Sequence, residues 1–445
     1  MNELKKIPMF IKIAYGCGAA GGNVMSTLLA SFLLSYYTDT AKIAAAAIGT
    51  MFIIARLLDG VTDFAMGGII DKTNTKLGKA RPWLIISSPL MVLGIILILS
   101  VPQNWSEVGK IVYAYFTYIF LNCVVYTIFG IAHTALLARM TRDYKDRNTT
   151  STISSILNNL SGLVIGTMIT VLQLKFGWTV TSVILGLSAG ILILIPGVLC
   201  KENVGMNEES EQRISVPIKE QMPAVIKNKY FWLALILGAL TLFVNANAIA
   251  AQIYYCNVVL QKPMYMAVLM SVGQAPGIII LFFMPWFANK FSKRVFMAGG
   301  AVLMILGFAL AGMAGTNTNM LLIGVIIRAI GIGPMFAGLY AFCADAADYG
   351  EWKFKVRSEG LMASSQSIGS KIGIGFGSAC TAWILAAANY DATAVTQSES
   401  VVSAIRFDYG WLGAIVSCGL LIGVLLMDVE KYLPEIRKSI KTKDI

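Results

Sequence analysis

The stretch that decides the fold is residues 56–82, which read R-L-L-D-G-V-T-D-F-A-M-G-G-I-I-D-K-T-N-T-K-L-G-K-A-R-P. Its first half carries an arginine and two acids, Arg56, Asp59 and Asp63, inside an apolar run that begins near Ala41. Its second half is a basic turn that leads into another apolar run. Charge inside a run of this kind is costly and marks a functional site by default.

The composition around this stretch is that of a polytopic membrane protein. Of the 445 residues, 57% are hydrophobic and only 13% are charged, whereas a soluble domain carries about 25% charged residues. Apolar runs of about 20 residues are long enough to cross a bilayer as helices. We predict twelve such runs, at residues 10–37, 41–70, 82–102, 110–139, 149–173, 178–200, 229–257, 264–288, 295–315, 319–347, 360–388 and 407–430.

The net charge is +11, and the basic residues that produce it are spread over several loops instead of forming a single patch. Basic residues gather in alternate loops, as the positive-inside rule expects for cytoplasmic ones. This distribution predicts that both termini and the long middle loop are cytoplasmic. It does not indicate a nucleic-acid partner.

The middle loop divides the chain into two halves of six spans. The sequence predicts an N-terminal half at 1–200, a polar cytoplasmic loop at 201–228, and a C-terminal half with a cytoplasmic tail at 229–445. We therefore predict an all-α protein with twelve transmembrane helices in two six-helix halves. Two such halves around a central cavity are the layout of the major facilitator fold.

Enzymatic and metal chemistry are not indicated. The seven cysteines are scattered without close pairs, and His133 is the only histidine. No nucleophile with a base and an orienting group is visible, and we expect no cofactor apart from a coupling ion. A non-transporting receptor or scaffold remains an alternative, in which Asp59 and Asp63 would be dispensable.

The two acids of the opening stretch lie four residues apart, so they share one helical face. Together they offer oxygens for a monovalent cation or a proton, and an ionised pair in low dielectric needs a cation, a proton or a basic partner. Thr127 and Lys371 each lie, like Asp59, about 17 residues from the predicted outer end of a span, roughly 25 Å along a helix. This depth predicts a coupling-ion and substrate site near the midplane, with a static ion-pair cluster as the alternative.

Other polar and aromatic residues within the spans are weaker signals. Amides that can line a cavity or join helices are Asn23, Asn159, Asn245, Asn247, Gln252 and Gln366. Tyrosines near the outer helix ends predict an aromatic belt: Tyr36, Tyr37, Tyr254 and Tyr255. Glycines crowd spans one and eleven, which indicates close helix packing. Arg328 in span ten has no evident acid partner.

Several motifs together resemble the glycoside–pentoside–hexuronide:cation symporters of the major facilitator superfamily. They are Y-G-C-G-A-A-G at 15–21, Y-Y-T-D at 36–39, R-x-x-D-x-x-x-D at 56–63, G-x-x-x-D-K-T at 67–73, G-K-A-R-P at 78–82, A-D-A-A-D-Y-G-E-W at 344–352 and K-x-G at 371–373. The resemblance spans nearly the whole chain, and the glucuronide carriers of the family look most similar. It implies uptake of a glycoside with Na⁺ or H⁺ across a bacterial inner membrane, by a functional monomer.

The resemblance also implies roles for particular residues. Cation binding falls on Asp59 and Asp63 with the hydroxyl of Thr127, and Na⁺ is one candidate ion there. Substrate binding or coupling falls on Lys371, and we add Arg56, Asn23, Asn159, Asn245 and Gln366 to that set. Cytoplasmic gate or scaffold contacts fall on Asp71, Arg81, Asp345, Asp348, Glu351 and Arg357.

The chain departs from the family at sugar-facing positions. Asn23, Gly130 and Ser155 stand where the melibiose carrier or other relatives have charged or amide residues, and Phe64 replaces the usual proline after the cation motif. Loss of sugar-binding acids while Lys371 is kept would suit an anionic glycoside such as a uronide. The alternative is a carrier of another substrate, a lipid or a drug, that uses the same acids for proton coupling.

Overall fold

The computed structural model describes residues 7–141, 143–202, 218–276, 292–354, 359–394, 396–432 and 435–436. All regular structure in these ranges is helical, apart from one isolated bridge between Thr75 and Gly78. The prediction of an all-α fold is therefore confirmed. Contact clustering gives two compact units: unit 1 is Met1–Glu211, Pro263–Ser271 and Asp391–Ala394, and unit 2 is the remainder.

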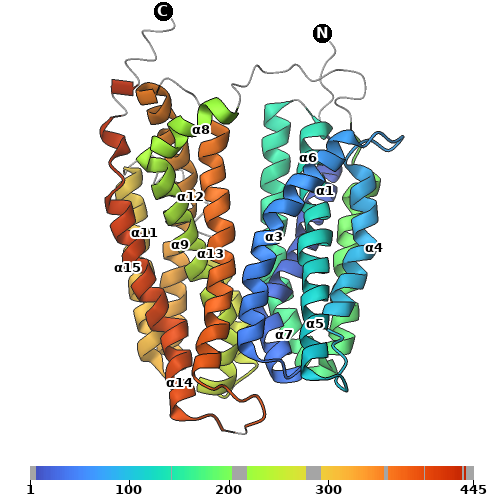
Figure 1. The fold of residues 1–445 in the computed structure, drawn as a ribbon, viewed down its shortest axis with the longest axis vertical. Helices are drawn as coiled ribbons and strands as arrows, with labels where there is room; N and C mark the ends of the chain where they lie inside the picture. Colours follow the sequence, from blue (N-terminus) through green and yellow to red (C-terminus); the bar gives the residue numbers. More distant parts are fainter. Residues whose placement is uncertain are drawn as a thin grey trace, which may run out of the picture. The chain divides into compact units, whose positions relative to one another are not determined.

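In unit 1 the helices follow the predicted spans (Figure 1). They are α1 (Met9–Ser31), α2 (Leu33–Ser35), the π-helical turn η1 (Tyr36–Thr40), α3 (Ala45–Lys72), α4 (Arg81–Ile98), α5 (Glu107–Tyr118), the π-helical turn η2 (Ile119–Val125), α6 (Tyr126–Met140) and α7 (Tyr144–Leu199). Helix α7 contains two predicted spans that meet at Gly177, whose φ of 74° interrupts the helical backbone. It packs along α1 and α4, and α3 packs against η2 and α6.

Unit 2 contains the later spans (Figure 1). They are α8 (Ile218–Lys227), α9 (Lys229–Tyr254), η3 (Tyr255–Val259), α11 (Lys293–Ala314), α12 (Thr318–Phe354), α13 (Glu359–Ala387), α14 (Glu399–Arg406), η4 (Phe407–Trp411), α15 (Leu412–Leu425) and η5 (Val429–Lys431). Helix α9 packs along α13, and α11 packs along α12 and α15. Helix α8 lies within the predicted middle loop.

Within the described residues, nine helices are long and apolar enough to cross a membrane, and the bent pair Met9–Ser31 with Leu33–Thr40 makes ten. One of them, α7, holds two predicted spans. The run predicted at 264–288 is helical from 265 to 276, and its remainder lies outside the described residues. The structure is thus consistent with twelve spans.

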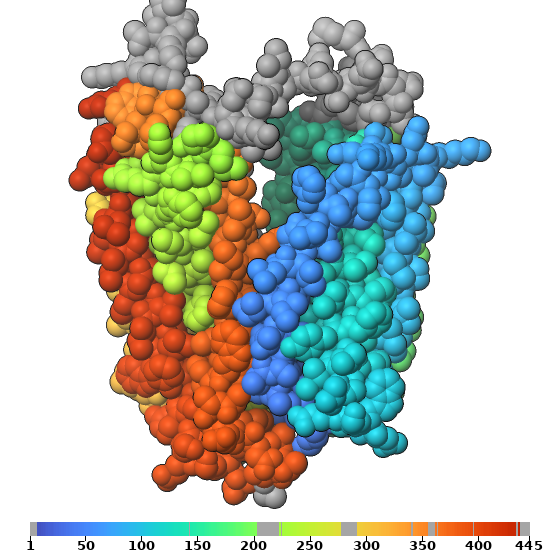
Figure 2. Space-filling model, viewed as in Figure 1, coloured from blue at the N-terminus to red at the C-terminus, as the bar shows by residue number. Residues whose placement is uncertain are grey.

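Large apolar side chains remain exposed on the faces of the helices. In the space-filling view α3 lies on the surface of its unit (Figure 2), where Leu57, Val61 and Phe64 are exposed. Exposed apolar surface on this scale is unfavourable in water but not in lipid. It agrees with the membrane location that the composition predicts.

The glycines of the eleventh span allow close packing, as predicted. A methyl group added at Gly369, Gly373 or Gly377 of α13 would overlap the carbonyl oxygens of Leu235, Ala239 or Phe243 on α9. Spacing of four residues places the three glycines on one face. Backbones in contact over this length are the small-residue packing that membrane helices use.

We expect Gly373→Ala to destabilise the protein by about 1–3 kcal/mol, because the methyl group forces α13 away from α9. The matched control is Gly299→Ala on α11, where an added methyl group meets nothing within 4 Å. Alanine there should be neutral or stabilise by up to about 1 kcal/mol. Thermal unfolding of both variants in one detergent checks this, and equal midpoints would contradict the packing assignment.

The predicted aromatic belt is wrong for these tyrosines. Tyr36, Tyr37, Tyr254 and Tyr255 are each no more than 2% exposed. The Tyr36 hydroxyl accepts a hydrogen bond from the Val101 amide at 3.0 Å. The Tyr255 hydroxyl donates to the Gly315 carbonyl at 2.8 Å, so two of these tyrosines are buried with a backbone partner for the hydroxyl.

Candidate functional site

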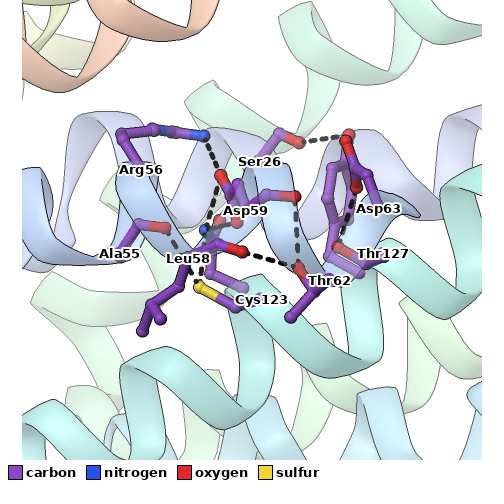
Figure 3. A network of polar contacts seen from close by, with 11 residues as sticks. Ser26, Ala55, Arg56, Leu58, Asp59, Thr62, Asp63, Cys123 and Thr127 are labelled. Carbon is purple, nitrogen blue, oxygen red and sulfur yellow. Dashed lines mark hydrogen bonds and ion pairs between the residues drawn. The ribbon is translucent and has the colours of Figure 1, made fainter. Parts of the chain in front are cut away.

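Asp59 of α3 lies in a buried polar cluster with a basic partner (Figure 3). Its side chain is 9% exposed, and Arg56 Nη1 lies 2.9 Å from Asp59 Oδ2, one turn earlier on the same helix. Asn122 Nδ2 donates to Asp59 Oδ1 at 3.1 Å from η2. A carboxylate with a guanidinium and an amide donor is stabilised in its charged form.

Asp63 lies one turn further along α3 and faces the first turn of α6. The Thr127 hydroxyl donates to Asp63 Oδ1 at 3.2 Å, and Thr127 is buried. Beside them the Ser26 hydroxyl of α1 donates to the Tyr126 hydroxyl at 3.2 Å. Figure 3 shows the side chains of α1, α3 and α6 gathered around this acid. The structure thus brings Asp59, Asp63 and Thr127 into one region of unit 1.

The π-helical turn η2 sets the register of this region. It lies between α5 and α6 and carries Asn122 and Cys123 toward α3, where the Cys123 thiol donates to the Ala55 carbonyl at 3.4 Å. A π turn inserts a residue into a helix and rotates the residues after it, and such turns are common at functional sites. Here the rotation allows Asn122 to face Asp59 while Thr127 faces Asp63.

The donor set suits a small cation bound by oxygen. Na⁺ is a hard cation and takes carboxylate and hydroxyl oxygens, as Asp63 and Thr127 supply, and a proton needs only one carboxylate. Within the described ranges, no three His, Cys, Asp or Glu side chains cluster as ligands for a metal ion.

The predicted substrate residues lie on helices of both units. Asn23 Nδ2 donates to the Asn158 carbonyl at 2.6 Å, which joins α1 to α7. Asn159 donates to the carbonyl four residues before it on α7. The remaining three are in unit 2: Asn245 on α9, and Gln366 and Lys371 on α13, of which Gln366 is 7% exposed and the others are half-buried.

At the start of α4 the structure reveals an acid that sequence reasoning missed. The Glu202 side chain is 4% exposed and accepts from the amides of Lys79, Ala80 and Arg81 at 3.0, 2.8 and 3.1 Å. Negative charge is favourable at a helix N-terminus, where amides lack partners. The approach requires Gly78, whose φ is +107° and whose added methyl group would overlap Glu202. Glu202 closely follows the sixth predicted span, at residues 178–200, so its sequence position resembled that of an ordinary loop charge.

Arg81 and Asp71 differ in the strength of their contacts. The Arg81 guanidinium donates to the carbonyls of Gly197 and Val198 at 3.0 and 2.9 Å, at the end of α7. The Asp71 side chain is 80% exposed and lies 3.9 Å from Arg139. An exposed pair at this distance contributes about 0–1 kcal/mol. Arg81 therefore joins α4 to α7 within unit 1, whereas Asp71 contributes little to the contact between α3 and α6.

We expect Glu202→Ala to lower stability by about 2 kcal/mol, because three amides at the start of α4 lose one charged acceptor. The matched control is Asp143→Ala, which removes a single bond to the Lys145 amide at the start of α7 and should cost about 1 kcal/mol. Thermal unfolding of both variants checks the difference. A Glu202→Ala midpoint above that of Asp143→Ala would contradict the cap.

The predicted gate residues of span ten lie on α12. Lys293 Nζ contacts both oxygens of Asp345 at 2.9 and 2.6 Å, which joins the start of α11 to α12. Asp348 and Glu351 are half-buried on the same helix. Arg357 lies outside the described residues. Whether any of these residues forms a gate stays a prediction.

His133 and Arg328 now have structural roles. His133 stacks on Tyr15 with ring centroids 4.1 Å apart, and its Nε2 lies 2.9 Å from the Tyr15 carbonyl oxygen, which ties α6 to α1. The Arg328 guanidinium lies 5.0 Å from the Phe308 ring and 4.8 Å from the Tyr409 ring. Arg328 also donates to the Tyr409 hydroxyl at 3.0 Å. Aromatic faces thus stabilise this cation.

Two groups besides Glu202 were not identified as site residues from the sequence. Asn122 was a visible signal, an amide inside the fourth span five residues before Thr127. Asp408 is an acid at the start of the twelfth run, and it is 2% exposed. In both cases the sequence shows a polar residue inside an apolar run, where its burial costs free energy. The partner of that residue became evident only in the structure.

Comparison with known proteins shows the family of the chain. Residues 14–431 match the family model described as MFS/sugar transport protein. The chain is 29% identical to the isoprimeverose transporter of Lactiplantibacillus pentosus, over 98% of this chain and 92% of that protein. It is 28% identical to the glucuronide carrier protein homolog of Escherichia coli (strain K12), over 92% of this chain and 89% of that protein.

A solved structure shows the same fold. The crystal structure of the nucleoside transporter NupG aligns with a TM-score of 0.63 at 15% identity, and covers 93% of this chain and 99% of that one. Identity this low supports the fold alone. The relatives are named as transporters and not as enzymes. The predicted resemblance to the cation symporters is therefore confirmed. The chain belongs to the MFS/sugar transport protein family, and it is a multi-span membrane transporter.

Proposed function

We propose that the protein imports a glycoside in symport with Na⁺ or H⁺ by alternating access, across a bacterial inner membrane with both termini in the cytoplasm. The relatives named for isoprimeverose and glucuronide transport support a glycoside as substrate. The observation that carries the proposal is the buried cluster of α3, in which Asp59 is paired with Arg56 and Asp63 accepts from Thr127.

We assign one monovalent cation or proton per cycle to α3, where the formal charges of Arg56, Asp59 and Asp63 sum to −1. Asp59 is held by Arg56 and Asn122, so we assign cation exchange to Asp63 and Thr127. Asp59 then orients the cluster, and it need not release its partner in each cycle.

Coupling to substrate is assigned to Lys371. An ammonium group in an apolar, glycine-rich span would suit an acidic glycoside such as a uronide. This assignment rests on the sign of the charges and on the family resemblance at 371–373.

The test is uptake of a panel of neutral and acidic glycosides into proteoliposomes that carry an imposed Na⁺ or pH gradient. We expect accumulation of at least one glycoside under one inward gradient and none without a gradient. Accumulation driven by an outward gradient would indicate export and contradict the proposal. If a neutral glycoside accumulates and no acidic glycoside does, the uronide assignment is wrong but the proposed symport stands.

A further inference from the structure

The twelfth span contains a buried acid that the candidate cation site does not use. Asp408 lies in η4, a π-helical turn of unit 2 between α14 and α15, and is 2% exposed. The residues that come after it in α15 are apolar or small. A carboxyl group in such surroundings must be stabilised by a cation, by hydrogen-bond donors or by a proton.

The contacts of Asp408 join three helices. Asn247 Nδ2 of α9 donates to Asp408 Oδ1 at 2.7 Å, and the same nitrogen donates to the Thr381 hydroxyl of α13 at 3.0 Å. Asn247 is 1% exposed and Thr381 is fully buried. Both hydrogens of the amide are thus used, and the two side chains that hold Asp408 are neutral.

No cation of the described residues lies within ion-pair distance of Asp408. Two arginines lie near Asp408, one in sequence and one through the neighbouring Tyr409, but their recorded contacts are with other groups. Arg406 of α14 donates to the Gly312 carbonyl at 3.4 Å, and Arg328 of α12 contacts the rings of Phe308 and Tyr409.

Apart from Arg406 and Arg328, no basic side chain of the described elements is recorded in contact with η4. Helix α11 has no charged side chain after its first two residues, and α15 has none. On α13 the titratable group that faces Asp408 is the Cys380 thiol, and on η4 it is the Tyr409 hydroxyl. The charged residues of α14 are Glu399 and Arg406. The recorded neighbours of Asp408 are thus the Asn247 amide and the Cys380 thiol, which carry no positive charge.

We propose that Asp408 is a proton-binding site of unit 2, occupied at neutral pH and separate from the cation site on α3. A protonated carboxyl is neutral, accepts the Asn247 amide and offers a hydroxyl donor of its own. This state removes the cost of a buried charge without any metal or basic partner. The inference does not depend on which cation drives transport.

The hydrogen bonds around Asp408 connect α9 and α13 to the π-helical turn η4. Loss of the proton would place a charge between α9, α13 and η4, which destabilises their packing. Removal of this proton at alkaline pH should therefore lower the stability of the folded protein.

Infrared spectroscopy of the purified protein in lipid tests the proposal, because a protonated carboxyl has a carbonyl band distinct from that of a carboxylate. We expect the band at neutral pH, its loss in Asp408→Asn, and its retention in Asp59→Asn, since Asp59 contacts the Arg56 guanidinium at 2.9 Å and lies in the other unit. Asparagine keeps an acceptor for Asn247, so the fold should persist. A wild-type spectrum without the band, or one unchanged by Asp408→Asn, would overturn the proposal.

A second measurement needs no variant. An apolar carbodiimide reacts with protonated carboxyl groups in membranes, and peptide mass spectrometry locates the adduct. We expect an adduct on Asp408 at neutral pH that declines at alkaline pH. Protection by added Na⁺ at constant pH would identify a sodium site instead and contradict proton occupancy. The symport proposal is tested separately, by gradient-driven uptake in Asp59→Asn. The outcome of that assay does not change what the adduct on Asp408 shows.

Discussion

Asp63→Asn is expected to abolish accumulation of substrate while leaving exchange across the membrane. With one cation and one neutral glycoside per cycle and a potential of about 100 mV, the driving force is about 2.3 kcal/mol, which supports roughly fifty-fold accumulation. An acidic glycoside makes the cycle electroneutral, and the concentration gradient of the cation then drives its accumulation. Asparagine is close in shape but neutral, so the charges of α3 sum to zero without a cation. The gradient then has no charge on which to act, and the ratio of inner to outer substrate should fall to about one.

Proteoliposomes with an imposed gradient measure this ratio, and counterflow of labelled substrate measures exchange. The matched control is Asp143→Asn, an acid of unit 1 that caps α7 and has no contact with the site. It should accumulate substrate as the wild type does. Concentrative uptake by Asp63→Asn at the wild-type ratio would remove Asp63 from the coupling step.

Arg56→Gln is expected to destabilise the protein through Asp59. Removal of one partner from a buried ion pair leaves an uncompensated charge and costs about 3–5 kcal/mol in general. The Arg56 side chain is 25% exposed, so we expect the lower end of that range. Thermal unfolding of Arg56→Gln, Asp59→Asn and the double variant gives the coupling energy.

The double variant decides between charge and packing. If the buried charge is the cause, Asp59→Asn in the Arg56→Gln background should restore most of the lost stability. If Arg56 acts by packing its long side chain, the two losses should add. An Arg56→Gln variant as stable as the wild type would show that Asp59 is not charged in the folded protein.

One physical reason allowed both the transmembrane helices and the functional role of the acids in α3 to be predicted from the sequence. Lipid offers no hydrogen bonds, so a charge inside an apolar run is conspicuous, and the spacing of Asp59 and Asp63 places them on one face of α3. The Arg56–Asp59 pair, three residues apart, was visible for the same reason. The major facilitator layout came from the count of spans and the polar middle loop.

The partners of those acids could not be predicted from spacing. Asn122 meets Asp59 only because η2 is a π turn, which rotates the chain relative to a continuous α-helix. Glu202 meets the start of α4 only through the fold of unit 1. Asp408 contacts Asn247, which is far from it in sequence. Contacts of this kind depend on helix rotation and tertiary packing, and a single sequence contains no direct signal of either.

The central claim is that cation and substrate bind to one coupled system. The most direct measurement is the dissociation constant of substrate with and without saturating cation, together with that of the cation with and without saturating substrate, in the same purified protein. The account predicts that each ligand tightens the other by one common factor, and that Asp63→Asn lowers this factor to about one. A substrate dissociation constant that is the same with and without Na⁺, and at acidic and alkaline pH, would contradict it.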